Sequence, residues 1–274
     1  MENKSFKFYP TTIEAVHLLV LLMVMQALID FPIALYDYYN DTNILSNSRI
    51  SLVSGIIIIS FIFFFGLKKS KTKITKVLPL KLFNPLLIIP IIILLIGLQY
   101  LVGLLNLQVE KVIPAPEWFW ELFNKLFENK YGFWGALIKV AIIAPLIEES
   151  LFRGIIMHGF MKNYKNWYSI LISAILFSVY HLNPWQMTYT FFLGLLLGWI
   201  MVRTNSLILC IITHSINNLS VLLSITFAKE ISESFIAGFS SSEKILYSTF
   251  ALITGVFLIW ILTKIKRNKV FKQA

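Results

Sequence analysis

The sequence predicts an all-α protein, a polytopic membrane helix bundle of about eight transmembrane helices with one amphipathic helix at the membrane interface. The chain of 274 residues is 57% hydrophobic and only 14% charged, and its mean hydropathy is +0.75. A soluble domain of this length could not cover so much apolar surface. No internal repeat and no Pro-, Gly- or Ser-rich linker divides the sequence, so we expect residues 1–274 to form a single integral membrane domain.

Eight apolar runs are candidate spans, most of them with the roughly 17–25 residues that a helix needs to cross a bilayer. They are, in order, about 13–36, 51–67, 85–105, 133–160, 167–181, 184–202, 207–227 and 245–262. Between the third and fourth runs, residues 110–130 mix charged and aromatic side chains at a spacing typical of an amphipathic helix in the membrane interface. Asn183 and Pro184 have the sequence of an N-cap and a first-turn proline, so the sixth helix is expected to begin directly after His181.

The net charge of +10 does not indicate a nucleic-acid partner, because the basic residues stand in short clusters beside the apolar runs. With the N-terminus placed in the cytoplasm, the loops after the even-numbered runs, such as 68–81, carry most of the lysines and arginines. The opposite loops carry most of the acidic residues, which is the positive-inside pattern. We therefore expect a multi-pass protein of the cell membrane with both termini cytoplasmic. The single cysteine, Cys210, excludes an intramolecular disulfide and is expected to pack in the core.

Two adjacent carboxylates, Glu148 and Glu149, and an arginine, Arg153, fall within the fourth run. An ionisable group at the centre of a membrane helix costs about 2.5–3.5 kcal/mol on insertion scales, so such groups usually have partners and a function. Glu149 and Arg153 are four residues apart and can form an intrahelical ion pair. Glu148 points about 100° away from Glu149, into a different environment. Pro145 is expected to bend the helix and to leave a backbone carbonyl without its usual partner.

Polar residues of two other runs are expected at a similar depth. Glu148 lies about 14 residues, or roughly 21 Å, from the cytoplasmic end of the fourth helix, and His181 lies at the same depth along the fifth. His214 and Asn218 lie about 9 and 13 residues, roughly 14 to 20 Å, along the seventh. They share one face of that helix because they are four residues apart. These groups can therefore converge on one cavity.

This set of side chains is suited to hydrolysing an amide bond without a covalent intermediate. A buried carboxylate beside an imidazole can hold a water molecule and take its proton. A second imidazole and an amide N–H can donate hydrogen bonds to the developing oxyanion. From the residues alone, the base can be Glu148 or Glu149, and the amide can be Asn218 or Asn217. A serine or cysteine nucleophile finds no support, because no triad surrounds any of them.

Three short motifs on successive apolar runs resemble those of a known family. They are Glu148-Glu149-x-x-x-Arg153, Phe177-x-x-x-His181 and His214-x-x-x-Asn218. In this order they resemble the CPBP family, which comprises the CAAX prenyl proteases of the Ras-converting-enzyme type and the bacteriocin-processing or immunity (Abi) proteins. The resemblance covers about residues 131–227.

The resemblance implies an intramembrane glutamate protease that needs no cofactor. In such an enzyme Glu148 would activate a water molecule together with His181, and His214 and Asn218 would form the oxyanion hole. The substrate would be a hydrophobic or lipidated peptide or protein, and nothing in the sequence indicates an oligomeric state. The supporting residues of the site would be Glu149, Arg153 and Phe177.

Two alternatives stay open. Glu148, His181 and His214 could instead ligate a zinc ion with one open position, as in zinc-dependent proteases. The HExxH helix of the zincins is absent, however, so we favour catalysis without a metal. The chain could also act without catalysis, as a membrane immunity protein that shields a cell from a bacteriocin by binding.

Overall fold

The computed structural model of the chain describes residues 8–42, 44, 48–121, 132–227 and 239–270. In these ranges the chain forms helices joined by turns and short connections, without a β-strand. The prediction of an all-α helix bundle is therefore confirmed.

The described helices include eleven α-helical segments and three short stretches of other helical types. The α-helices are α1 (Thr12–Asn40), α2 (Ser48–Ser70), α3 (Ile74–Val77), α4 (Ile88–Val112), α6 (Gly132–Ala136), α7 (Ala144–Glu149), α8 (Met157–Asn163), α9 (Asn166–Tyr180), α10 (Pro184–Thr204), α11 (Leu207–Thr226) and α13 (Ser241–Val270). The others are a 3-10 turn, η1 (Pro85–Leu87), and two π-helical stretches, η2 (Leu137–Ile143) and η3 (Ser150–Ile156).

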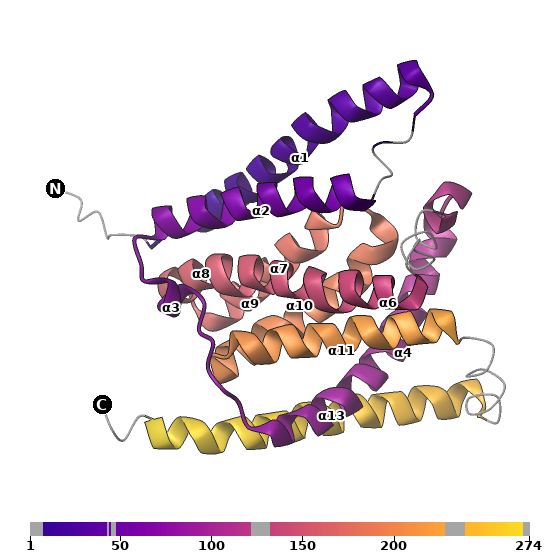
Figure 1. Cartoon of the computed structure of the whole chain (residues 1–274). Helices are drawn as coiled ribbons and strands as arrows, with labels where there is room; N and C mark the ends of the chain where they lie inside the picture. The colour runs from indigo at the N-terminus through magenta and orange to yellow at the C-terminus, as the bar shows by residue number, and fades with distance from the viewer. Residues whose placement is uncertain (1–7, 43, 45–47, 122–131, 228–238, 271–274) are drawn as a thin grey trace.

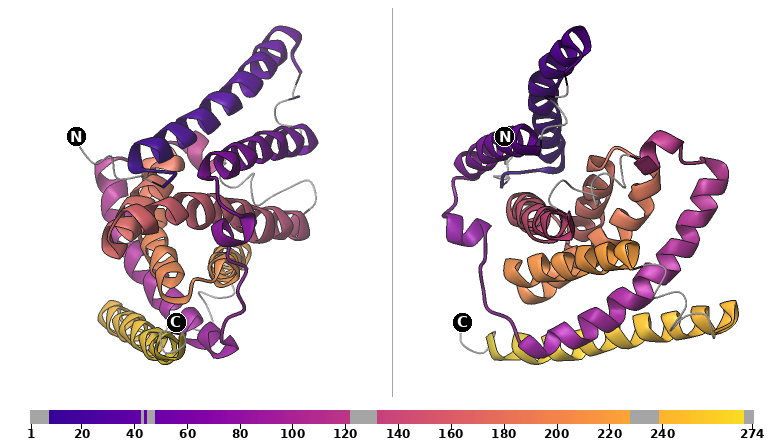
Figure 2. Two further views of the ribbon diagram at one scale, coloured as in Figure 1. Left: turned by 90° about the vertical axis from the view of Figure 1, so that its left-hand side faces the viewer. Right: turned by 45° about the vertical axis from the view of Figure 1, so that its right-hand side comes forward.

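The helices lie in three groups, which Figure 1 shows from one side of the bundle. The α1–α2 pair stands on one flank, and α4 packs along α13 on the other, as Figure 2 also shows. The segments from α6 to α11 lie between these flanks. In Figure 1, α1 begins and α13 ends at the same end of the bundle, where α2 and α8 also end.

Six helices in the described part of the chain are long and apolar enough to cross a membrane, judged by length and composition. They cover residues 12–40, 53–70, 85–112, 184–204, 207–226 and 241–263. These six correspond to six of the eight predicted spans. The other two predicted spans are helical as well, but α9 has only 15 residues, and the fourth span is divided into α-helical and π-helical segments.

The fourth predicted span is a continuous helical run from Gly132 to Asn163 that changes twice from α to π geometry. At the end of η2, the N–H of Ala144 donates to the carbonyl five residues earlier. Pro145 comes next and has no N–H. In this register it therefore cannot supply a main-chain hydrogen bond to the carbonyl of Val140, five residues before it. Stretches of π-helix inside α-helices occur frequently at functional sites.

The connection between α9 and α10 is a tight turn fixed by a helix cap. The side chain of Asn183 accepts a hydrogen bond of 2.8 Å from the N–H of Gln186, and Pro184 occupies the first turn of α10. Leu182 has a positive φ of 53°, so the chain reverses within a few residues. The predicted start of this helix, directly after His181, is confirmed.

The predicted amphipathic helix over residues 110–130 lies only partly within the described residues. Helix α4 continues to Val112, the chain is helical again over 117–121, and residues 122–130 lie outside the described part. The predicted helix is therefore interrupted between its first residues and its aromatic part.

The aromatic residues of this segment cover the turn between α9 and α10. The rings of Trp118 and Phe119 lie 6.2 and 4.6 Å from the ring of Trp185, measured between centroids. The indole N–H of Trp185 donates a hydrogen bond of 2.8 Å to the carbonyl of Ile113. Trp185 stands in the first turn of α10, so these aromatic side chains pack against that turn.

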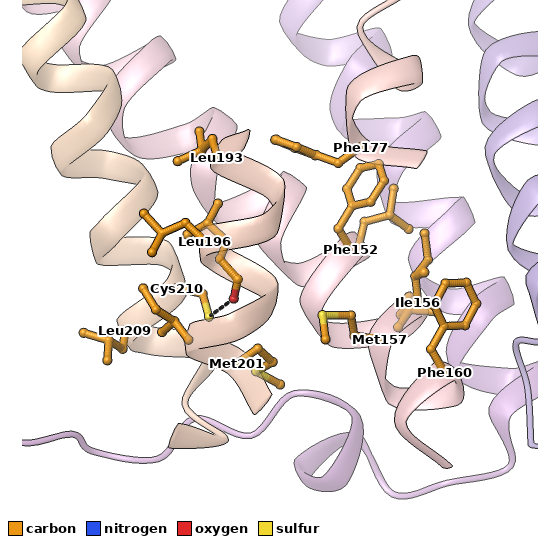
Figure 3. Close-up of a cluster of buried hydrophobic side chains, with 14 of the residues drawn as sticks. Phe152, Ile156, Met157, Phe160, Phe177, Leu193, Leu196, Met201, Leu209 and Cys210 are labelled. Carbon is orange, nitrogen blue, oxygen red and sulfur yellow. Dashed lines mark hydrogen bonds between the residues drawn. The ribbon is translucent and has the colours of Figure 1, made fainter. Parts of the chain in front are cut away.

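The hydrophobic core surrounds the middle of the fourth span, as Figure 3 shows. Phe152 and Phe177 meet there edge to face, with ring centroids 5.0 Å apart. Both side chains are fully buried. Cys210 is also buried, with its Sγ 3.6 Å from the carbonyl of Leu197, a position that suits a packing residue. The polar side chains that lie near Phe152 and Phe177 therefore stand in apolar surroundings.

We expect Gly97→Ala to weaken the contact between α4 and α13. A Cβ atom at Gly97 would lie 2.4 Å from the carbonyl oxygen of Ser248 and 2.8 Å from the backbone nitrogen of Leu252. Overpacking of this kind costs about 1–3 kcal/mol, so the apparent unfolding temperature in detergent should fall by several degrees. Gly103→Ala on the same helix is the control, because a Cβ there meets nothing within 4 Å. Equal unfolding temperatures for the two variants would contradict this packing.

Candidate active site

The centre of the candidate site is the carboxylate of Glu149, which is 0% exposed. One of its oxygens lies 3.1 Å from Nη1 of Arg153 and 2.8 Å from Nδ1 of His214. The ion pair expected from the spacing of Glu149 and Arg153 is thus present, and it has a third member from α11. A second guanidinium nitrogen of Arg153 donates to the carbonyl of Gly194 in α10, at 3.1 Å. These contacts of Glu149 and Arg153 therefore join the fourth span to α10 and α11.

This contact fixes which nitrogen of His214 is available for chemistry. A carboxylate accepts hydrogen bonds, and Arg153 supplies the opposite charge to Glu149, so Nδ1 of His214 is the donor in the contact between them. Nε2 then points to the other side of the ring. It lies 4.0 Å from a carboxylate oxygen of Glu148.

Glu148 and Glu149 occupy different environments, as their separation around the helix predicts. The Glu148 side chain is 20% exposed, whereas that of Glu149 is 0% exposed. Glu149 is held by two hydrogen-bond donors, whereas the contact of Glu148 with His214, at 4.0 Å, is longer than a hydrogen bond. Of the two carboxylates, Glu148 is therefore the one that can reach a water molecule or a ligand.

His181 stands at the C-terminal end of α9, where it is the capping residue. Its Nδ1 lies 2.8 Å from the carbonyl oxygen of Phe177, one turn earlier. A carbonyl oxygen only accepts hydrogen bonds, so Nδ1 carries the hydrogen. In the neutral ring, Nε2 of His181 is then a hydrogen-bond acceptor. This is the form of the ring that can take a hydrogen bond from water.

Phe177 lies between the two histidines. Its ring packs edge to face on His181 at 5.0 Å and on His214 at 5.8 Å, measured between centroids. The guanidinium of Arg153 lies 4.7 Å from the centre of the same ring. Phe177 is fully buried. It therefore sets the spacing of the two imidazoles and shields Arg153 from solvent.

Asn218 contacts the π-helical stretch of the fourth span. Its Nδ2 donates a hydrogen bond of 2.9 Å to the carbonyl of Val140, the group that Pro145 leaves without a main-chain donor in the π register. The carbonyl oxygen of the Asn218 side chain accepts 3.1 Å from Nδ2 of Asn217. Asn218 is partly buried, whereas Asn217 is 1% exposed. The two amides thus face different surroundings.

The structure brings six of the seven predicted residues into one chain of direct contacts. These six are Glu148, Glu149, Arg153, Phe177, His181 and His214. Asn218 joins them by its place one turn after His214 on α11. Among the described side chains, Glu148 and His181 share no direct hydrogen bond or ion pair. The ring of Tyr180, the residue before His181, lies 5.9 Å from the imidazole of His181, measured between centroids.

The polar residues that surround Asn217 were not predicted from the sequence. Tyr189 of α10 and Gln99 of α4 both donate to its side-chain carbonyl. Each is a polar residue within an otherwise apolar span, which is a signal that could have singled them out. Their shared partner could not have been found by spacing, because the three residues stand on three different helices.

The alternative zinc ligands predicted from the sequence are Glu148, His181 and His214. In the part of the chain that the structure describes, no group of three or more His, Cys, Asp or Glu side chains is placed to hold a metal ion. The two histidines do have Nδ1 hydrogen-bonded, as metal-ligating histidines commonly do. Glu148 and His214 lie 4.0 Å apart, but the third donor, His181, does not join them.

We expect Glu149→Leu to destabilise the protein strongly, because it leaves the buried charge of Arg153 without its partner. Removing one member of a buried ion pair costs about 3–5 kcal/mol. The double variant Glu149→Leu/Arg153→Met removes both charges and should recover part of this loss. Thermal unfolding in detergent measures both effects. A double variant no more stable than the single one would contradict the pairing.

The comparisons with known proteins bear on the same part of the chain. Residues 130–220 match the family described as type II CAAX prenyl endopeptidase Rce1-like. An "Uncharacterized 24.3 kDa protein" of Escherichia coli is 34% identical over 83 residues, which cover 28% of this chain and 38% of that relative. The matched part of the chain thus spans less than two fifths of that relative's length. No solved structure matches the chain.

The matched segment runs from the start of the fourth span into α11 and contains all three motifs. It is also the segment that lies between the two flanking helix pairs. The resemblance that the motifs carry is therefore confirmed, because residues 130–220 of this chain are similar to the Rce1-like type II CAAX prenyl endopeptidases.

Proposed function

We propose that this protein is an intramembrane endopeptidase in which Glu148 and His181 activate a water molecule. The observation that carries the proposal is the division between the two carboxylates. Glu149 is enclosed and paired with Arg153 and His214, whereas Glu148 is partly exposed beside the same histidine. A general base needs access to water, and only Glu148 has it.

The geometry of the histidines supports the same roles. Nε2 of His181 accepts a hydrogen bond in the neutral ring, so it can orient the water while Glu148 takes the proton. Nε2 of His214 faces the same side as Glu148. To donate to an oxyanion from Nε2, His214 must carry both ring hydrogens, and the oxyanion together with the carboxylate of Glu149 would balance the charges of His214 and Arg153 at that stage.

The proposed reaction balances without a covalent intermediate. Glu148 takes one proton from the water, and the water oxygen attacks the carbonyl carbon of the peptide bond. His214 and Asn218 donate hydrogen bonds to the oxygen that gains the negative charge. When the tetrahedral intermediate collapses, the C–N bond breaks and the proton held by Glu148 passes to the leaving amine.

A hydrophobic or lipidated peptide is the substrate class that the surroundings suit. A groove of about 340 Å³ lies between α1, α2 and the fourth span, and its lining is mostly apolar. Ile147 and Leu151 contribute to that lining. Ile147 lies about 100° around the helix from Glu148, so an apolar chain in this groove would lie beside the site helix.

The orientation of the bundle is part of the proposal. Basic residues occupy the last turns of α2, α8 and α10, and α2 and α8 end where α1 begins and α13 ends. The positive-inside tendency places such an end in the cytoplasm. We therefore propose that both termini face the cytoplasm and that the chain crosses the cell membrane several times.

We expect Glu148→Gln to abolish peptide cleavage, because the amide cannot take a proton from water. The loss of a general base lowers the turnover number by about 10²–10⁴-fold. Comparative mass spectrometry of membrane and secreted peptides from wild-type and variant cells measures this effect and identifies the substrates. Glu243→Gln makes the same chemical change at an exposed carboxylate of α13 and should leave cleavage unchanged.

The peptide comparison also separates catalysis from binding. Unchanged peptides in Glu148→Gln cells, at equal protein levels in the membrane, would refute the protease and favour an immunity protein that acts by binding.

We expect cleavage by the purified protein to survive treatment with 1,10-phenanthroline. The described donor groups form no three-ligand site, and the proposed roles of Glu148 and His181 need no metal. The measurement is the cleavage rate before and after chelation, and then after zinc is added back. A rate that falls on chelation and returns with zinc would assign the site to zinc chemistry instead.

A further inference from the structure

A buried polar network lies behind Asn218, between α4, α10 and α11. Asn217 is at its centre and is 1% exposed. The hydroxyl of Tyr189 and Nε2 of Gln99 both contact Oδ1 of Asn217, the latter at 3.4 Å. Gln99 also contacts Ser220, whose hydroxyl donates 2.7 Å to the backbone carbonyl of Asn217. Buried polar groups at membrane depth are costly unless they are satisfied, so this network calls for an explanation.

The direction of the hydrogen bonds follows from one group, the backbone carbonyl of Val140. A carbonyl only accepts, so the atom of Asn218 that faces it must be Nδ2. The side-chain oxygen of Asn218 then faces Asn217, which must donate from its own Nδ2, at 3.1 Å. The oxygen of Asn217 is left facing Tyr189 and Gln99, which must donate to it. Each side chain in this series of hydrogen bonds therefore has a single orientation that is consistent with all of the contacts.

This chain of contacts holds the Asn218 amide at both of its polar atoms. One Nδ2 hydrogen of Asn218 is directed to Val140, and the second remains for a ligand. His214 lies one turn earlier on the same face of α11. A rotation of the Asn218 amide by 180° would present an oxygen, which repels an oxyanion. Asn217 opposes that rotation, because its Nδ2 needs the oxygen where it is.

We propose that Asn217 is a positioning residue, anchored by Tyr189 and Gln99, that fixes the amide of Asn218 for oxyanion binding. The inference rests on the proposed function, since it assigns Asn218 to the oxyanion hole. It also separates the two adjacent asparagines, which the sequence leaves interchangeable. Asn218 is the donor to substrate, and Asn217 sets its orientation.

The experiment is a double-mutant cycle on the full chain in detergent. The variants are Asn217→Ala, Asn218→Ala and both together, assayed with a quenched fluorescent peptide that ends in a farnesylated CAAX sequence. Loss of an oxyanion donor lowers kcat by about 10²–10³-fold, so we expect the kcat of Asn218→Ala to fall by that factor. Asn217→Ala should lower kcat by about tenfold with KM within twofold, because one of the two contacts that hold the amide remains.

The double variant decides between positioning and general destabilisation. If Asn217 acts through Asn218, the tenfold loss of kcat caused by Asn217→Ala disappears in the Asn218→Ala background. The double variant then has the same kcat as Asn218→Ala. An undiminished effect in that background, or a wild-type kcat for Asn217→Ala, would overturn the positioning role alone. If the wild type and Glu148→Gln cleave the peptide equally, the proposed function fails and this inference fails with it.

Two further variants guard against misfolding. Tyr189→Phe removes one donor to Asn217 and keeps the ring, so it should give a smaller loss of kcat that also disappears in the Asn218→Ala background. Thr213→Val is the matched control on α11. Thr213 is fully buried and its hydroxyl donates only to the carbonyl of Leu209 in its own helix, so kcat should not change. A Thr213→Val loss as large as that of Asn217→Ala would also overturn the inference.

Discussion

The contact on which the rest of the site depends is the carboxylate of Glu149, shared by Arg153 and His214 inside the bundle. It brings the fourth span, α10 and α11 together at one point, because Arg153 also binds the backbone of α10. Buried charges are stable only when they are paired and hydrogen-bonded, and the low dielectric around them strengthens each contact. In the same surroundings a shift of one helix would leave a charge unpaired, so the relative positions of these helices are closely fixed. The position of His214 is set in this way by Glu149 and, through it, by Arg153.

Two neighbouring carboxylates thus have different environments in one helix. Glu149 is enclosed by its two partners, whereas Glu148 is partly exposed. Environments that differ between adjacent acidic residues are a common way for proteins to assign different tasks to identical groups. The two asparagines of α11 repeat the same division with amides. Asn217 is turned into a polar network with α4 and α10, while Asn218 faces the fourth span. In both pairs, the helical offset of about 100° gives the two neighbours different surroundings.

The sequence was sufficient for the helices and for some of the contacts among the candidate residues, for identifiable physical reasons. Lipid requires each span to satisfy its own backbone, so hydropathy and length locate the helices. Spacing of four residues placed Glu149 with Arg153 and His214 with Asn218, because these pairs depend on the helix alone. The pairing of Glu149 with His214 depends on how α11 packs against the fourth span, and no local rule contains it. The π register of η2 was also beyond the sequence argument. The proline predicted a free carbonyl, but the structure alone identifies Val140 as the carbonyl that Asn218 uses.

The short length of α9 has a consequence for the lipid around the protein. A helix of 15 residues rises about 22 Å, roughly 8 Å less than the thickness of a typical hydrocarbon core. A shortfall of this size draws the polar headgroups inward or is made up by apolar protein surface. The aromatic side chains that lie over Trp185 supply such surface on one side of the turn. Where α9 faced lipid, a bilayer that thinned to match it would bring the aqueous boundary closer to His181 than the full membrane thickness would allow.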